Sequence, residues 1–391
     1  MRAALTGSDP RAPAWPVAGL AAIAVLTLYA VLVLWLEKEL AILLLVLGGA
    51  AAAYAAGRLG WLEHAKADLG DRPGLLNCGA IAAVLAIAAV FHGDHFALLM
   101  VATVLLYILA CLGLTIQFGY AGLLNFSGAA FFGIGCYTSA VLTAHTALPH
   151  LLVLLAGGIM AAIIGSLLIL PVLRTRGHYA AVVTIAFALL FRTFLEVNDV
   201  LGGPQGLPVA NMNLFGWDFG SGIEIGPVET SFLLNYVLLA LVLVALGMVL
   251  TKRVERSWIG LDMDAVRLDE TAAACFGIEL WRWKITAFTL GNFLAGTAGG
   301  LYGMMIAFIA PTNFTFADSL IMVSIVLLGG IGNPWGVVAA AAIVIVLPEK
   351  LQVIQEYRFL IFALLVILIL RFRPEGLLPR GPRQYVSGLP R

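Results

Sequence analysis

The chain has 391 residues, of which 62% are hydrophobic and only 11% are charged, and its 22 basic residues balance 22 acidic ones. Soluble proteins carry about 25% charged residues, so this chain lacks the polar surface that a water-soluble globule of its length needs. The composition excludes a disordered chain, a disulfide-stabilised scaffold and a nucleic-acid-binding protein, and it indicates a polytopic membrane protein.

Long apolar runs recur along the whole sequence. A run of about twenty apolar residues can cross a bilayer as a helix, whereas the strands of membrane barrels alternate apolar and polar residues. The sequence therefore predicts an all-α polytopic membrane protein with ten to twelve transmembrane helices, some of them broken or re-entrant. The predicted spans are residues 17–36, 40–57, 74–91, 96–117, 128–146, 151–173, 177–197, 231–251, 284–309, 318–333, 335–348 and 358–371. The interruption at Gly332-Asn333-Pro334 is typical of a broken or re-entrant helix pair.

The basic residues orient these spans. If the loop 252–283 is cytoplasmic, 18 Lys and Arg residues lie on that side and 3 on the other, with Arg192 inside a span. Because Lys and Arg accumulate in cytoplasmic loops, we expect both termini in the cytoplasm. The long loop 198–230, which has no basic residue, then faces outward.

Two polar pairs interrupt the apolar segments. Asn125 and Ser127 lie in a Gly-rich break between two helices, and irregular backbone at membrane depth requires surrounding protein or a water-filled path. They either line a transport path or form a cytoplasmic turn. Arg192 and Glu196 are spaced i,i+4 near the end of a span. They either contact a zwitterionic substrate or a partner protein, or form a local ion pair.

The glycines in the span 284–309 indicate helix packing and not a binding site. The small residues Gly296, Gly299, Gly300 and Gly303 form overlapping small-xxx-small pairs, which predict close packing of helices. In the same span, Asn292 is predicted to hydrogen-bond to a neighbouring helix.

The outward loop contains a rigid, turn-forming sequence. Gly202, Gly203, Pro204, Gln205 and Gly206 follow one another, and Gly and Pro favour tight turns. The segment is either a docking surface or gate on the outer face, or a connector that needs turns.

The inward loop contains a predicted helix over residues 264–276. Asp262 or Asp264 is its expected N-cap, and Gly277 is its expected stop. Its small side chains allow two interpretations. It either forms a projection that fits a cleft of a cytoplasmic partner and transmits motion, or lies idle on the membrane surface.

Three sequence segments stand out: Gly-Tyr-Ala-Gly-Leu at 119–123, Ala-Val-Arg-Leu-Asp-Glu-Thr-Ala-Ala at 265–273 and Arg-Pro-Glu-Gly-Leu-Leu-Pro at 373–379. Further segments occur in a fixed order with them, namely residues 129–135, 171–179, 202–206, 276–278, 295–296 and 327–332, with Thr184, Lys284, Ala287 and Phe288. In this order, the segments resemble the permease subunits of branched-chain amino acid ABC importers, of the M type. Two segments depart from the pattern. Acidic residues at 262 and 264 replace basic ones, and residues 124–128 replace a Ser-Leu-Gly-Gln sequence.

The resemblance implies a domain organisation and roles for particular residues. Residues 1–94 would be N-terminal transmembrane segments with little likeness to the family, 95–380 the permease domain, with its coupling loop at 252–283, and 381–391 a cytoplasmic tail. The cytoplasmic coupling helix would contact an ATPase through Ala265, Arg267, Asp269, Glu270, Ala272, Ala273 and Gly277. The translocation path would be lined by Asn125, Ser127 and Thr184. A binding protein would dock on Arg192, Glu196, Gly202, Gly203, Pro204, Gln205 and Gly206.

The resemblance also implies the partners of the chain. A second, related permease subunit would complete the pore as a heterodimer in the bacterial inner membrane, surrounded by lipid. A periplasmic binding protein would deliver the substrate, and two cytoplasmic ATPases would hold ATP and Mg²⁺. This chain has no Gly-x-x-x-x-Gly-Lys-[Ser/Thr] sequence, which is the phosphate-binding motif of ATPases. It is expected to carry no cofactor or metal. The alternatives are the same architecture carrying urea, short amides or small aromatic acids, and an ion-coupled secondary transporter. The near absence of charge in the spans weakens the last of these.

Overall fold

The computed structural model describes residues 17–58, 73–173, 179–214, 216–222, 224–225, 228–351 and 375–381, with 357, 360, 364, 367 and 371 as single positions. The chain divides into two compact units, Met1–Phe91 and His92–Arg391, and each is described by itself. Most of the predicted span 358–371, most of the tail 381–391, and Arg174 to His178 of the matching segment 171–179 lie outside the described residues.

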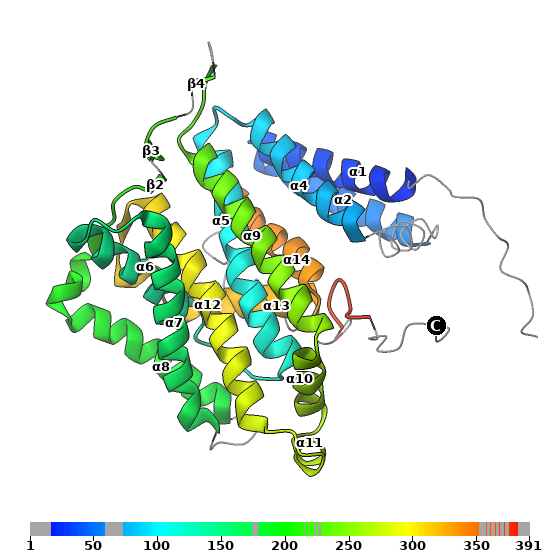
Figure 1. Ribbon diagram of the computed structural model, residues 1–391. Coiled ribbons are helices and arrows are strands. Elements are labelled where there is room, and N and C mark those ends of the chain that lie inside the picture. Colours follow the sequence, from blue (N-terminus) through cyan, green and yellow to red (C-terminus); the bar gives the residue numbers. More distant parts are fainter. Residues whose placement is uncertain are drawn as a thin grey trace, which may run out of the picture. The chain divides into compact units, whose positions relative to one another are not determined.

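Among the described residues of the first unit there are three apolar helices, coloured in shades of blue in Figure 1. They are α1 (Val17–Trp35), α2 (Glu39–Arg58) and α4 (Pro73–Val90), and their bounds lie within three residues of the predicted spans. Within this unit, α1 packs against α4.

The second unit is a bundle whose long helices also follow the predicted spans. They are α5 (His95–Thr115), α6 (Gly128–His145), α7 (His150–Leu173), α8 (Tyr179–Val197), α9 (Leu233–Arg256), α12 (Leu280–Ile306), α13 (Phe316–Gly329) and α14 (Pro334–Lys350). Among the described residues, five helices are long and apolar enough to cross a membrane by length and composition. The prediction of a helical polytopic membrane fold is confirmed, whereas the number of crossings stays a prediction.

Helix α12 lies at the centre of this bundle and packs against α5, α6 and α7. The contact is so close that a Cβ on Gly135 of α6 would overlap the carbonyl oxygen of Gly296 of α12. Next to it, the Cys136 thiol donates to the carbonyl oxygen of Gly299 at 2.9 Å. The predicted role of the α12 glycines in close packing is therefore confirmed.

Two ends of the bundle carry the irregular elements (Figure 1). At one end, called here the knob end, α5 continues as a π-helix (Ile116–Tyr120), and α9 is followed by the short helices α10 (Trp258–Leu268) and α11 (Glu270–Cys275). At the other end, called the loop end, 3₁₀ turns and two-residue strands connect the helices. They are the turns Asp199–Leu201, Gly203–Gln205 and Pro311–Asn313, and the strands β1 (Leu207–Pro208), β2 (Asn213–Leu214), β3 (Trp217–Asp218), β4 (Glu224–Ile225), β5 (Val228–Glu229) and β6 (Phe308–Ile309).

The short strands form three antiparallel pairs. β1 pairs with β6, with Leu207 opposite Ile309, while β2 pairs with β3 and β4 with β5. The β1–β6 pair is the informative one, because it fastens the long loop after α8 to the chain that leaves α12.

The prediction of one continuous helix over 264–276 is wrong. The helix breaks at Asp269, which has extended backbone angles, and its Oδ1 accepts hydrogen bonds from the backbone N–H groups of Thr271 and Ala272 at 2.8 and 3.0 Å. Asp269 is therefore the N-cap of α11, and neither Asp262 nor Asp264 caps this segment. Both acids lie inside α10, which begins after Ser257. Gly277 does follow the helix end, with φ of +81°.

Candidate functional site

A projection at the knob end is the first candidate site. We call residues 268–277, which include α11, the knob. Two large apolar side chains of the knob are exposed: Leu268 is 76% exposed and Phe276 is 86% exposed. The Asp269 cap fixes its start, and Glu270 pairs with Lys284 of α12, with 2.7 Å between Oε1 and Nζ. The knob is thus fixed at its start by these two contacts and presents an apolar tip at Leu268 and Phe276, which is typical of a surface that meets another protein.

The structure brings the predicted coupling residues together around this projection. Ala273 is buried against the bundle and Ala265 is half-buried, whereas the others are exposed. The exposed ones are Arg267, Asp269, Glu270, Ala272 and Gly277. This placement suits contact with a partner, but it does not test that contact.

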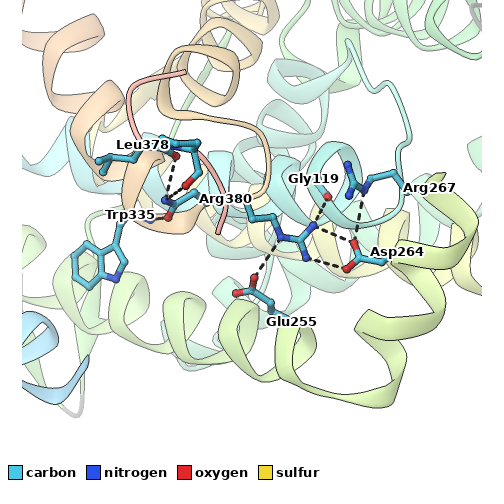
Figure 2. A network of polar contacts seen from close by, with 9 residues as sticks. Gly119, Glu255, Asp264, Arg267, Trp335, Leu378 and Arg380 are labelled. Carbon is cyan, nitrogen blue, oxygen red and sulfur yellow. Dashed lines mark hydrogen bonds and ion pairs between the residues drawn. The ribbon is translucent and has the colours of Figure 1, made fainter. Parts of the chain in front are cut away.

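Behind the knob, Arg267 of α10 lies over the chain segment that follows the π-helix. A Cβ on Gly122 would be 2.9 Å from Cγ of Arg267, and Gly122 has φ of +67°, so the position favours glycine on both counts. The Arg267 guanidinium also pairs with Asp264, with 3.6 Å between Nε and Oδ1 (Figure 2). Two separate segments of the family resemblance, 119–123 and 265–273, therefore meet in space.

The predicted path residues form an interior network of hydrogen bonds. Asn125 Nδ2 donates to Gln117 Oε1 at 2.8 Å and to Asn292 Oδ1 at 3.3 Å. Asn125 Oδ1 accepts from the backbone N–H and the hydroxyl of Ser127 at 2.9 and 2.6 Å. Gln117 Nε2 donates to Asn292 Oδ1 at 3.0 Å, which confirms the predicted role of Asn292. The four side chains belong to the π-helix, to the stretch that follows it, and to α12.

Two hydroxyl groups complete the hydrogen bonding of this irregular stretch. Thr184 Oγ1, on α8, accepts from the N–H of Phe126 at 3.1 Å. Ser319 Oγ, on α13, accepts from the N–H of Ala129 at 3.0 Å, in the first turn of α6. Irregular backbone inside a membrane bundle needs such partners because lipid offers none. The side chains of Asn125, Ser127 and Thr184 are fully buried within this chain, and their role in lining a path stays a prediction.

Sequence reasoning missed two members of this network. Gln117 stands at the end of a predicted span and Ser319 lies near the start of another, and both are fully buried. The amide at 117 was a readable signal, because a polar side chain next to an apolar run needs a partner. A serine beside Asp318 gives no such signal.

At the loop end, the predicted docking residues are arranged on a clamped turn. Gly202, Gly203 and Gly206 have φ of +81°, +50° and +78°, which glycine adopts without strain. The Val209 N–H donates to Ala307 O at 2.9 Å beside the β1–β6 pair. Pro204 and Gln205 are held in a 3₁₀ turn between the glycines.

The predicted ion pair of α8 is formed close to this turn. Arg192 Nε and Glu196 Oε1 are 2.8 Å apart, with side chains 40% and 38% exposed. Such an exposed pair contributes little stability, about 0–1 kcal/mol. The geometry therefore leaves both groups available at the surface.

The second unit is therefore a polytopic membrane bundle with a projection at one end and a clamped loop at the other. The family model of the branched-chain amino acid transport system permease component matches residues 95–370, and the chain belongs to this family. It is 36% identical over 310 residues, 76% of this chain and 73% of the relative, to the high-affinity branched-chain amino acid transport system permease protein LivM of Escherichia coli K12.

More distant relatives are of two kinds. A probable branched-chain amino acid transport permease protein LivM of Methanocaldococcus jannaschii is 24% identical over 71% of this chain and 91% of the relative. The permease protein LivH of Salmonella typhimurium is also 24% identical, over 70% of this chain and 91% of the relative. No solved structure gives a significant match.

Proposed function

We propose that this chain is the M-type permease subunit of an ABC importer and forms half of a translocation path for branched-chain or related amino acids. The observation that carries this proposal is the 36% identity to LivM over 310 residues. The family model matches residues 95–370, a range that includes the bundle and both candidate surfaces. The substrate is proposed from that relative's name. The chain itself would hold no cofactor, no metal and no ATPase site.

The knob is the proposed contact with cytoplasmic ATPases. The ATPases would bind ATP and Mg²⁺. The movement that follows ATP hydrolysis would reach this chain through α10 and α11. The exposed apolar tip at Leu268 and Phe276 supports this role, since it is rigidly held and has no cover within the described part of this chain. With the knob inside, both termini would lie in the cytoplasm, as the distribution of Lys and Arg predicts.

The opposite end is the proposed contact with a periplasmic binding protein. The clamped turn at 202–206 and the Arg192–Glu196 pair lie there together, so a delivered amino acid would enter from this side. The likeness to LivH as well as LivM supports a second, related permease as the partner in the bacterial inner membrane.

Reconstitution tests the proposal. The chain would be co-purified with a candidate second permease and candidate ATPases from the same organism, placed in proteoliposomes, and supplied with a candidate binding protein. We expect ATP-dependent uptake of labelled leucine that unlabelled isoleucine inhibits and urea does not. Uptake of urea with no uptake of leucine would contradict the substrate class, and uptake without ATP would contradict the importer class.

A pair of variants at one position tests the knob. Phe276→Asp places a charge on the exposed tip, so we expect the ATPase subunits to be lost during purification and uptake to fall to background. Phe276→Leu keeps an apolar side chain at the same site and should retain both. Normal uptake by Phe276→Asp would remove the knob from the proposed interface.

A further inference from the structure

The chain that follows the last predicted span returns to the knob end as an ordered segment. We call residues 375–381 the strap. It is fastened to the end of α13 by backbone hydrogen bonds from the Leu377 N–H to Leu328 O at 2.8 Å and from the Leu378 N–H to Gly329 O at 3.1 Å. Asn333 Nδ2 donates to Leu378 O at 3.1 Å. The strap thus supplies partners for the last carbonyl groups of α13.

Arg380 extends from this strap into the space between three other elements (Figure 2). Its guanidinium donates two hydrogen bonds to the two oxygens of Asp264 of α10, at 3.0 and 3.1 Å. It also donates to Gly119 O of the π-helix at 3.1 Å and to Glu255 of α9 at 3.4 Å. The fork-shaped pairing on Asp264 is the geometry for which arginine is suited and lysine is not.

The surroundings of Arg380 make these contacts more significant than a surface ion pair. Only 12% of the Arg380 side chain and 10% of the Asp264 side chain are exposed. The guanidinium also lies over the ring of Tyr120, 4.7 Å from its centroid. Removing one member of such a pair leaves the other charge poorly solvated, which is more costly than losing an exposed pair.

Asp264 is the acid on which the two guanidinium groups converge, because it pairs with both Arg380 and Arg267. A basic residue at 264 would repel the guanidinium. The charge at 264 is thus complementary to the strap of this same chain.

We propose that Arg380 is a positioning residue, and that the strap fixes α10 to the inner ends of α5, α9, α13 and α14, so that movement of the knob is passed to the membrane-spanning helices. This inference rests on the proposed function of the knob. Its physical basis is that α10 cannot move relative to the strap without separating the Arg380–Asp264 pair.

Hydrogen exchange on the purified chain in detergent tests the strap without any partner. In Arg380→Ala, the amides of Leu377 and Leu378 and those of α10 should exchange at least about tenfold faster than in wild type. Arg282→Ala is the matched control, because it removes another ion pair at the same end, the exposed contact of Arg282 with Glu279 at 2.9 Å. That variant should leave the strap amides unchanged.

Coupling is measured in the assembled transporter, as the ratio of ATPase activity with loaded binding protein to basal activity. Arg380→Ala should lower this ratio and leucine uptake by about fivefold or more with basal activity retained, and Arg380→Lys should restore only part of it. Asp264→Asn should show the same defect, and the double variant should be no worse than either single one. Glu255→Gln, which weakens the 3.4 Å contact of Glu255 with Arg380 and leaves the Arg380–Asp264 pair in place, replaces Arg380→Ala if the latter is not recovered from membranes.

Each outcome decides the matter. Unchanged exchange in Arg380→Ala would overturn the strap itself. Faster exchange with an unchanged ATPase ratio would show that the strap stabilises the fold without transmitting movement, and would overturn the positioning role. A wild-type complex without transport would overturn the proposed function together with the transmission step, and this failure is distinguishable because it appears before any variant is made.

Discussion

The hydrogen bonds of Asn125 provide the sharpest test of the interior network. In Asn125→Ala, three buried groups lose the partner that they have in the structure: Gln117 Oε1, and the backbone N–H and hydroxyl of Ser127. Asn292 Oδ1 keeps its bond from Gln117 Nε2. Leaving a buried polar group unsatisfied costs about 1–3 kcal/mol, so even the low end lowers the free energy of unfolding by about 3 kcal/mol.

The native cysteines provide the assay. Cys111 and Cys136 are buried, whereas Cys78 and Cys275 are exposed. A thiol-reactive dye added to the purified chain in detergent therefore labels two thiols at once and the other two only on unfolding. We expect the second phase of labelling to occur several degrees lower in Asn125→Ala than in wild type.

Asn313→Ala is the matched control, because Asn313 is exposed and its contact with Thr312 is long, at 3.5 Å. It should unfold like wild type. The reasoning is refuted if Asn125→Ala also unfolds like wild type. In that case, a changed KM for leucine with unchanged stability would show that Asn125 faces the path instead of closing a network.

Three further substitutions probe the other contacts. Gly135→Ala should separate α6 from α12 and lower the dye-measured unfolding temperature, at a cost of about 1–3 kcal/mol. Its control is Gly48→Ala, where an added Cβ meets nothing within 4 Å, and this variant should have an unchanged or slightly higher unfolding temperature. Equal unfolding temperatures for both variants would contradict the packing argument. Asp269→Ala removes the cap of α11 at a cost of about 1 kcal/mol, and hydrogen exchange in α11 should accelerate by about fivefold, with no acceleration arguing against the cap. Glu196→Gln should leave the unfolding temperature unchanged but raise the binding-protein concentration needed for half-maximal ATPase stimulation; an unchanged requirement would exclude Glu196 from docking.

The sequence was sufficient for the elements that depend on local composition. Apolar runs placed the helices, and the spacing of small residues placed the α12 contact, because both follow from burial along one segment. The break at Asp269 was also readable in principle, since an aspartate whose carboxylate can reach the N–H groups two and three residues later is a common helix start. It was missed because the surrounding alanines favour a continuous helix.

The position of Asp264 could not be predicted in the same way. Asp264 lies near the start of a predicted helix, where an acid is expected to be the N-cap, so the local sequence gave no reason to look for a distant partner. Its actual partner, Arg380, is 116 residues away in the chain. No local pattern specifies which of many basic residues reaches a given acid, so a contact of this kind becomes visible only in the folded chain.

Several irregular backbone segments of the bundle lie where the knob joins it. The π-helix ends at Tyr120, the extended stretch reaches α6 at Gly128, and α13 and α14 are separated at Gly330 to Asn333. A Cβ on Gly119 would overlap the backbone of Gly332, so two of these breaks touch directly. Continuous helices would move as rods, whereas π-helical and broken segments permit a change of direction with little loss of hydrogen bonding. The breaks, and the side chains that satisfy them, therefore mark the point at which a displacement of α10 would be converted into a rearrangement of α5 and α13.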